Sequence, residues 1–538
     1  MNEVLLLVGI VIMICILLGR FAENLPVPSL LIFIGLGMFF GANGPIGIQF
    51  DDYSVSESIC TICLIFIMFY GGFGTNIASA RPVLGKSLCL STLGVILTAG
   101  FTGAFIHFVL RLSWTESILI GSVIASTDAA SVFNILRSQS LALKDNTASL
   151  LEVESGSNDP ISYMLTLVLI SVITGAKISV PLMLFQQIFF GLAGGFLIGW
   201  IGILLLRHFN FEMEQGRTIF VFAVALTAYA LPSLLGGNGY LSVYLSGILM
   251  GNYYIPDKKY LVHFFDTITG ISQMIIFFLL GLLVTPAQLG PVLIPAILIM
   301  VFLTLMGRPL SVLLILAPFR SSFRQIGVTA WSGLRGVASI VFSILVVLND
   351  VPMKYNIFNL VFCIVLMSIA IQGTLLPWVS EKLQMIDLHG NVERTFNDYQ
   401  ESTDVSFIKI SVKEGDRLSH CLVKDASFPS GLLIVMIVRG AESIVPNGNT
   451  EILPGDLLVV AAPEFEDRKN LSLYENVIRP NHPWLNKPLR KISIPAGCLI
   501  VLILRDGTSI IPEGKDVLRE GDIIVTARFK KEAAAFYV

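Results

Sequence analysis

Charge is what this sequence has least of. Asp, Glu, Lys and Arg make up 14% of its 538 residues, whereas about 25% is usual in soluble domains. Hydrophobic residues make up 54%, and the mean hydropathy is +0.79. This composition excludes an ordinary soluble enzyme, and the net charge of −3 gives no reason to expect a nucleic-acid partner.

Cysteine and histidine are too scattered to build a disulfide framework or a metal site. The seven cysteines are an odd number, which argues against a disulfide framework. Cys60 and Cys63 are close in sequence, but they lie in an apolar segment, where this spacing is ordinary for one face of a helix. The six histidines show no HExxH or comparable spacing, so we expect no structural metal.

Three diagnostic strings are also missing. The sequence has no TVGYG filter, which is typical of potassium channels, and no GxGD string of the kind an intramembrane aspartyl protease carries. Residues 382–404 hold no GxGxxG and leave no room for a nucleotide-binding half-domain. We therefore expect no enzyme activity and no bound NAD or other cofactor, and the missing filter argues against a channel.

Long apolar runs fill the first part of the chain. The N-terminal run has neither a basic region before it nor a small-x-small cleavage site after it, so we interpret it as an uncleaved first span. We predict about thirteen transmembrane helices, at residues 4–19, 27–41, 56–74, 86–109, 114–136, 147–173, 181–206, 217–235, 239–251, 266–284, 289–316, 322–348 and 355–379. The ninth is the shortest, and its loss would reverse every later span.

Positive charge in the loops indicates the orientation. With the N-terminus outside, eleven Lys and Arg residues fall in cytoplasmic loops and three in outer loops. The cytoplasmic set is Arg20, Arg81, Lys86, Arg137, Lys144, Arg207, Arg217, Lys258, Lys259, Arg320 and Arg324, and the outer set is Arg111, Lys177 and Lys354. Because Lys and Arg favour cytoplasmic loops, we expect the N-terminus outside and the C-terminal tail in the cytoplasm.

A polar linker precedes a repeated tail. Residues 429–460 match residues 495–526 at a constant offset of 66 without a gap, and each copy has two β-branched runs around a Pro-x-Gly turn. We predict a transmembrane domain at 1–381, a linker at 382–404, and two small cytoplasmic α+β modules at 405–477 and 478–538.

Carboxylates at the head of the sixth span are the strongest functional signal. Glu152, Glu154 and Asp159 precede a long apolar run, and each would cost about 2.5–3.5 kcal/mol near a bilayer centre. Ser155 and Asp159 are four residues apart, as are Glu154 and Asn158, so each pair shares one stripe of a helix. The first pair offers a hydroxyl and a carboxylate to a cation, and the second pair contains a carboxylate that needs a positive partner.

Two other spans contain helix-breaking sequences. The fifth holds Ser126, Thr127 and Asp128 within GSVIASTDAASVFN, and the twelfth holds Arg335 within GLRG. Such stretches can be polar packing seams of small residues, but interrupted helices in corresponding places of two halves are typical of secondary transporters. We therefore predict inverted six-helix repeats, with freed carbonyls near Thr127 that meet an ion.

Arginine supplies the counter-charges. We predict that Arg335 pairs with Glu154, because a guanidinium stays charged when buried and holds a carboxylate bidentately. We expect Arg308 to cap helix ends or to extend toward the membrane surface, and Glu152 to lie at the cytoplasmic interface.

Three strings, STDAASVF, LEVESGSNDP and GLRGVASI, closely resemble motifs of the monovalent cation:proton antiporters, in the NhaP-like branch that carries an Asn-Asp pair. The resemblance covers the whole membrane part. The tail resembles TrkA-C (RCK C-terminal) modules, with the CorC/HlyC type as an alternative for the second. Together the parts look like the bacterial K⁺/H⁺ antiporters of the cell-volume-regulation group, which implies a bacterial plasma (inner) membrane and a role in pH and volume homeostasis.

This resemblance implies a homodimer in which each chain has a rigid scaffold and a mobile six-helix core with crossed broken helices. It implies that Asp159 binds a proton or a monovalent cation in turn, with Asn158 as its neutral neighbour. Ser155 would be a side-chain ligand, Thr127 would contribute through its unwound backbone, and Asp128 would lie beside it.

The resemblance also makes Glu154 and Arg335 a structural ion pair of the core. One departure from the pattern is notable, because many relatives carry an acid in the third span where this chain has Tyr70. Tail modules of relatives bind small anions or cyclic dinucleotides, so cyclic di-AMP is a candidate regulator.

The resulting hypothesis is an electroneutral exchange of one K⁺, or alternatively Na⁺, for one H⁺ by alternating access. Cation and proton compete for Asp159, and Asn158 cannot titrate, so one negative charge has to be balanced. The alternatives are an RCK-regulated cation channel, a Na⁺-selective Na⁺/H⁺ antiporter and a membrane-tethered sensor.

Overall fold

The computed structural model describes most of the chain. The residues outside the description are 1–8, 18–27, 43, 140, 176–178, 210–213, 254, 256–257, 388–404, 413, 415, 417, 427–431, 440–441, 464–470, 479, 481, 493, 495–497, 506–507, 511, 513 and 530–538. The chain forms two compact units, Met1–Gln400 and Glu401–Val538.

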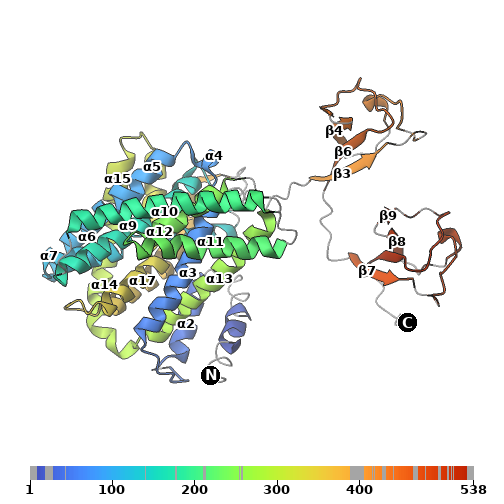
Figure 1. Ribbon diagram of the computed structural model, residues 1–538. Coiled ribbons are helices and arrows are strands. Elements are labelled where there is room, and N and C mark those ends of the chain that lie inside the picture. Colours follow the sequence, from blue (N-terminus) through green and yellow to red (C-terminus); the bar gives the residue numbers. More distant parts are fainter. Residues whose placement is uncertain are drawn as a thin grey trace. The chain divides into compact units, whose positions relative to one another are not determined.

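Among its described residues, the first unit is helical apart from a two-stranded antiparallel sheet of β1 (Ala142–Leu143) and β2 (Ile386–Asp387). After a helical segment at 9–17, its helices are α2 (Ser29–Phe40), α3 (Tyr53–Gly74), α4 (Ile77–Ala80), α5 (Leu84–Cys89), α6 (Val95–Leu110), α7 (Trp114–Val123), α8 (Ala129–Ser138), α9 (Thr147–Ile173), α10 (Val180–His208), α11 (Glu214–Leu234), α12 (Gly239–Gly251), α13 (Lys258–Leu283), α14 (Gly290–Phe302), α15 (Arg308–Leu316), α16 (Phe323–Trp331), α17 (Val337–Leu348), α18 (Ile357–Met367) and α19 (Thr374–Lys382) (Figure 1).

Apolar length accounts for most of these helices. Among the described residues, eight helices are long and apolar enough to cross a membrane, and shorter apolar helices occur at Leu30–Phe40, Gly239–Gly251 and Val337–Leu348. The ninth predicted span therefore exists as the short helix α12. The total of about thirteen spans stays a prediction, since several pieces are shorter than the roughly 20 residues of a straight span.

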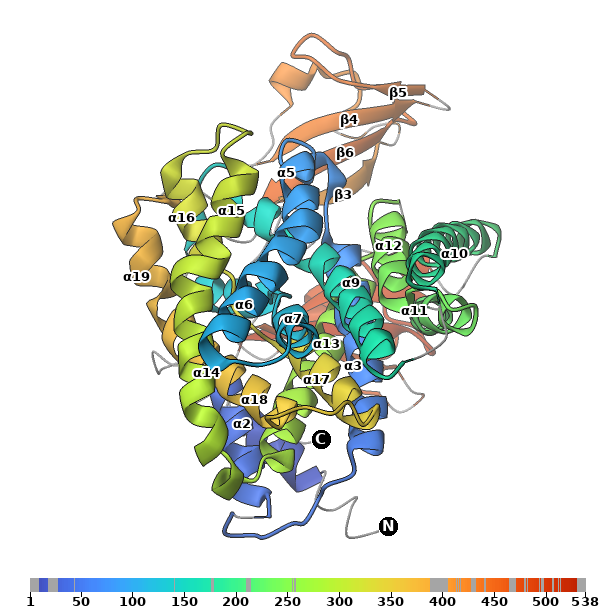
Figure 2. The ribbon, with the colours of Figure 1, turned by 90° about the vertical axis from the view of Figure 1, so that its left-hand side faces the viewer.

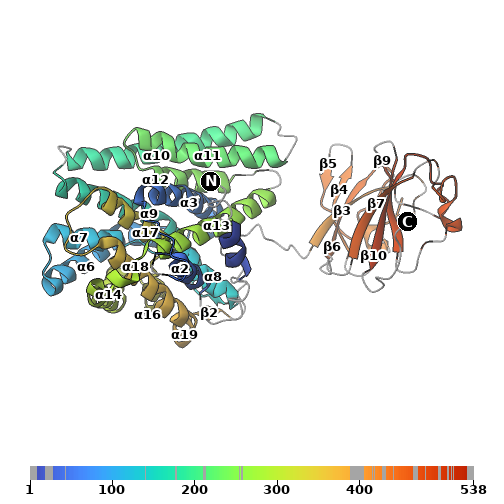
Figure 3. The same cartoon turned by 90° about the horizontal axis from the view of Figure 1, so that it is seen from below.

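The helices form two groups around a central set. Figure 2 shows α6, α14 and α15 on one side of the unit and α10 and α11 on the other, with α3, α9 and α13 between them. Figure 3 shows α10 and α11 as an outermost pair lying against α12. The helices α2 and α13 approach closely at Gly37 and Gly281, where a Cβ on either residue would overlap the backbone of the other helix.

Both predicted interruptions are present. The fifth span breaks between α7 and α8, and the twelfth breaks between α16 and α17. The two extended stretches meet, because the Asp128 N–H donates to the Leu334 carbonyl at 2.8 Å. The broken helices therefore cross at their interruptions, and residues near Thr127 and Arg335 lie in non-helical backbone as expected.

Among the described residues, three further spans contain π-helical turns. These are η1 (Leu90–Gly94), which joins α5 to α6, η3 (Leu303–Gly307), which joins α14 to α15, and η4 (Ser368–Gly373), which joins α18 to α19. A π turn shifts the helix face by a residue, and such turns are frequent at functional sites. Here η3 comes directly before Arg308. The turn η4 contains Ser368, which accepts a hydrogen bond from the Arg335 N–H.

The second unit holds two sheets of the same topology. The first has the strand order β3 (Val405–Ser411), β6 (Leu457–Pro463), β4 (Leu433–Arg439), β5 (Glu442–Ile444), and the second has β7 (Leu471–Val477), β10 (Ile523–Phe529), β8 (Cys498–Arg505), β9 (Thr508–Ile510). The pairs are antiparallel.

The tail differs from the predicted α+β modules in one respect. Its described residues contain strands and two short 3₁₀ turns, Val423–Asp425 and Leu489–Lys491, but no α-helix. Each copy is dominated by β-branched runs separated by Pro and Gly, which favour strands and turns over helix. The sequence repeat is therefore a repeat of one antiparallel sheet.

Candidate functional site

Asp159 is buried within α9. Only 9% of Asp159 is exposed, and Asn158 is fully buried. The helix continues through Pro160, so both side chains stay on one regular helix. The Ser126 hydroxyl donates to Asp159 Oδ1. The carboxylate thus faces the interruption between α7 and α8, and a proton or a cation would offset the high cost of burying its charge.

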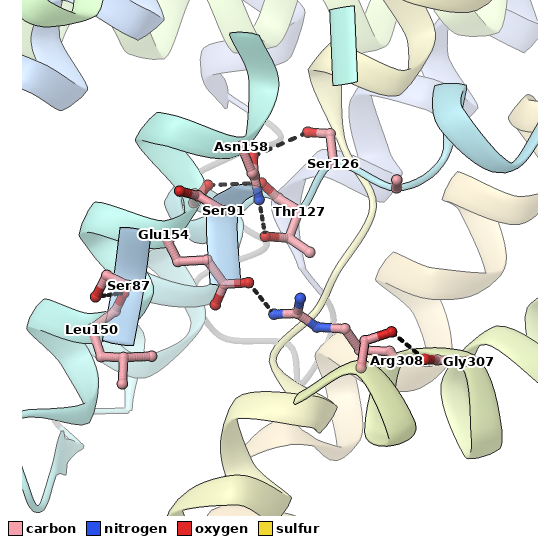
Figure 4. A network of polar contacts seen from close by, with 12 residues as sticks. Ser87, Ser91, Ser126, Thr127, Leu150, Glu154, Asn158, Gly307 and Arg308 are labelled. Atoms are coloured by element: carbon pink, nitrogen blue, oxygen red, sulfur yellow. Dashed lines mark hydrogen bonds and ion pairs between the residues drawn. The ribbon is translucent and has the colours of Figure 1, made fainter. Parts of the chain in front are cut away.

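Ser155 and Asn158 hold that interruption in place. Asn158 Nδ2 donates to Thr127 Oγ1 at 2.6 Å, as Figure 4 shows, and Ser155 Oγ donates to the Thr127 carbonyl at 2.7 Å. Ser126 Oγ also approaches Asn158 Oδ1 at 3.4 Å. The predicted site residues therefore lie together, and their binding of a cation stays a prediction.

Asp128 lies at the start of two half-helices. Its Oδ1 accepts from the Ser131 N–H at 3.1 Å and its Oδ2 accepts from the Ser131 hydroxyl at 2.6 Å, at the N-terminus of α8. Gly336, the residue before α17, lies so close that a Cβ there would overlap the Asp128 carboxylate. Helix N-termini stabilise negative charge, so Asp128 is satisfied by the fold itself.

Arg335 binds the C-terminal end of a half-helix. Its Nη1 donates to the carbonyls of Ala125 at 2.6 Å and Ser126 at 2.7 Å, just past the end of α7. Its own N–H donates to Ser368 Oγ in η4 at 3.0 Å. With 1% of the residue exposed, the guanidinium lies at a helix C-terminus, where positive charge is favoured.

The predicted pairing of Glu154 with Arg335 is wrong. Arg308 Nη2 forms the ion pair with Glu154 Oε1 (Figure 4), and their side chains are 3% and 1% exposed. Arg308 is the first residue of α15, directly after the π turn η3, and it is buried in the core at 2% exposure, so it does not extend toward the membrane surface. Arg335 donates to backbone carbonyls instead, because it lies in the extended interruption.

A cavity of about 280 Å³ reaches the Asp159 carboxylate. Its lining includes Ser126, Thr127, Asp128, Ser155 and Asp159 from the predicted site. The lining also includes Glu152, which is 7% exposed, and its place at the cytoplasmic interface stays a prediction.

Sequence reasoning missed one side of this cavity. Asp266, Thr269 and Gln273 of α13 line it, together with Tyr70 of α3, whose position was already noted from the sequence. A signal was available, because Asp266, Thr269 and Gln273 are spaced three and four residues apart in an apolar span, which places them on one helix face.

Comparison with known proteins agrees with this geometry. Residues 8–382 match the family described as sodium/hydrogen exchanger, transmembrane. The chain belongs to the sodium/hydrogen exchanger family. Residues 407–464 and 473–526 both match the TrkA-C domain, so the exchanger domain is followed by two TrkA-C modules.

Relatives of this exchanger cover most of its length. It is 33% identical over 476 residues to the K(+)/H(+) antiporter NhaP2 of Shewanella sp. (strain ANA-3), covering 86% of this chain and 82% of the relative. It is 35% identical over 387 residues to the K(+)/H(+) antiporter NhaP of Alkalimonas amylolytica, covering 71% and 67%. The sodium proton antiporter MjNhaP1 from Methanocaldococcus jannaschii superposes with a TM-score of 0.62 at 24% identity, covering 70% of this chain and 97% of that structure, which shows a shared fold.

Proposed function

We propose that this exchanger moves K⁺ against H⁺ at Asp159, with Na⁺ as the alternative cation. The observation that carries the proposal is a buried carboxylate at the end of a water-accessible cavity, surrounded by Ser126, Thr127 and Ser155 oxygens. Oxygen ligands suit hard monovalent cations. The preference for K⁺ rests on the names of the relatives NhaP2 and NhaP.

Electroneutral one-for-one exchange is supported by the carboxylates around the interruption between α7 and α8. Asp128 is held by Ser131 and faces the start of α17, and Glu154 is paired with Arg308. Asn158 carries no charge. Asp159 is then the carboxylate that alternately binds one proton or one cation. The core moves when Asp159 is neutralised by either, because moving an uncompensated charge through a low-dielectric region is costly.

The setting of this exchange is a further part of the proposal. The chain works as a homodimer in a bacterial plasma membrane, with the N-terminus outside and the TrkA-C modules in the cytoplasm, as the charge bias of the loops favours. The cavity then opens to the cytoplasm. The TrkA-C modules regulate exchange by binding a ligand, for which cyclic di-AMP is a candidate.

The test uses purified protein in liposomes that contain a pH dye. Pulses of K⁺, Na⁺ and Li⁺ are applied separately, with the membrane potential clamped or free. We expect K⁺-dependent pH recovery whose rate does not depend on the potential. A potential-dependent rate would overturn one-for-one exchange.

The matched variant is Asp159→Asn, which keeps the shape of the side chain and removes its charge. We expect it to abolish cation-dependent pH recovery at an equal amount of protein in the membrane. The control is Asp350→Asn, the same change at an exposed aspartate outside the cavity, which keeps wild-type exchange. Recovery that survives in Asp159→Asn would sink the site assignment.

A further inference from the structure

One face of α13 adds a second set of oxygen atoms to the cavity. Asp266, Thr269 and Gln273 lie on this face and line the same cavity as Asp159. Thr269 and Gln273 are 8% and 6% exposed, whereas Asp266 is exposed. Asp266 therefore lies at the mouth of the cavity, and Thr269 and Gln273 lie deeper inside.

Tyr70 holds the Asp266 carboxylate from the opposite helix. Its hydroxyl donates to Asp266 Oδ1 at 3.1 Å, and Tyr70 itself is 3% exposed. A buried tyrosine ring has few orientations, so this bond fixes one oxygen of the carboxylate at the mouth. Because Asp266 is exposed, solvent also reaches this residue.

Thr269 has a hydroxyl with no hydrogen-bond partner among the described residues. A threonine within a helix usually bonds the carbonyl one turn before it, and a buried polar group without a partner costs about 1–3 kcal/mol. Thr269 lines a cavity that already holds carboxylates, and its hydroxyl oxygen is buried. A ligand that accepts or coordinates there would remove the cost.

Two glycines line the cavity near Asp266. Gly71 of α3 and Gly270 of α13 both line the cavity, and a Cβ added to either would meet nothing within 4 Å. The gap between α3 and α13 therefore has room for a cation that keeps part of its water shell.

We propose that Asp266, oriented by Tyr70 and assisted by Thr269, is a second cation station at the cavity mouth that loads Asp159. This proposal rests on the cation/proton exchange proposed above. Asp266 attracts the cation and exchanges part of its water shell, and the cation then moves to Asp159, where it displaces the proton. Asp266 is a specificity and loading residue, whereas Asp159 performs the exchange.

The competing interpretation is that the Tyr70–Asp266 bond only fastens α3 to α13. The two interpretations differ in what they predict for substrate concentration. A loading station changes the cation concentration for half-maximal exchange and leaves the maximal rate. A structural bond changes protein stability or the maximal rate and leaves the half-maximal concentration.

The experiment measures exchange against K⁺ concentration in liposomes, with ionic strength held by choline chloride. We expect Asp266→Asn to raise the half-maximal K⁺ concentration by about three- to tenfold at low ionic strength, and the increase to shrink at high ionic strength because salt screens an exposed charge. The control Asp350→Asn removes an exposed carboxylate elsewhere and should match the wild type.

A second variant returns the charge from the opposite helix. Tyr70→Glu combined with Asp266→Asn places a carboxylate across the same 3.1 Å contact, and we expect it to recover most of the lost affinity. A half-maximal K⁺ concentration within twofold of the wild type in Asp266→Asn overturns the proposal while leaving the exchange function standing. Loss of all exchange in the wild type would instead overturn the function.

If Asp266→Asn does not accumulate in the membrane, Asp266→Cys can be modified after folding. A negatively charged thiol reagent should lower the half-maximal K⁺ concentration relative to the unmodified protein, and a positively charged reagent should raise it. The same reagents on the wild type correct for native cysteines. Equal half-maximal concentrations with both reagents would refute the loading station.

Discussion

The ion pair between Glu154 and Arg308 gives the sharpest test of the site geometry. Both side chains are almost fully buried, at 1% and 3% exposure. Removing one partner of a buried pair leaves an uncompensated charge and costs about 3–5 kcal/mol. We therefore expect Arg308→Met, which keeps the aliphatic volume, to lower the unfolding temperature by on the order of 10 °C.

The second half of the test removes the stranded charge. Glu154→Gln in the Arg308→Met background should recover at least about half of the loss, because a neutral amide in place of Glu154 needs no counter-charge. The same Glu154→Gln change should not rescue Arg335→Met, since Arg335 donates to the Ala125 and Ser126 carbonyls and its effects should add to those at Glu154.

The assay is thermal unfolding of the purified protein in detergent, followed by the fraction that remains monodisperse after heating. All five variants, including Glu154→Gln alone, are compared at the same protein and detergent concentration. The reasoning fails if Glu154→Gln rescues Arg335→Met more than Arg308→Met. That result would restore the pairing expected from the sequence.

Two other predictions concern the crossing and the tail. Gly336→Ala should lower the exchange rate about tenfold or more at equal protein, because its Cβ overlaps the Asp128 carboxylate and overpacking costs about 1–3 kcal/mol. The control Gly100→Ala, whose Cβ meets nothing within 4 Å, should keep the wild-type rate. In the tail, the Arg439 guanidinium holds the pKa of Asp456 below its usual range. This bond stabilises the first module above the ordinary aspartate pKa of about 4 and is lost as pH falls through the lowered value. Asp456→Asn should therefore lower the urea midpoint for amide protection of the first module at pH 7. The difference from the wild type should shrink below about pH 4, and the midpoint of the second module should stay unchanged. An equal difference at both pH values would count against this bond.

Much of this protein follows from local sequence patterns. Apolar runs long enough for a bilayer predict helices, and β-branched runs around Pro and Gly turns predict the strands of the tail, because both depend on residues close together in the chain. The spacing of Ser155 and Asp159 was readable for the same reason. The interruption at Thr127 was also predictable, since small and polar residues that interrupt an apolar run are typical of the broken helices of transporters.

Contacts between distant spans were decided by the tertiary structure. Glu154 and Arg308 are separated by 154 residues, and sequence alone offered two arginines without showing which one pairs with Glu154. Arg308 follows a π turn and pairs with Glu154, whereas Arg335 comes directly after the crossing at Leu334 and donates to backbone carbonyls.

Asp266 illustrates the same division. Its chemistry was visible in the sequence, but its place at the mouth depends on α13 packing beside α3, which brings Asp266 against Tyr70. The sequence by itself determined which segments become helices and strands and which side chains can carry charge. The tertiary structure decided which charges meet, because packing brings together residues far apart in the chain, and a local sequence pattern does not predict such contacts.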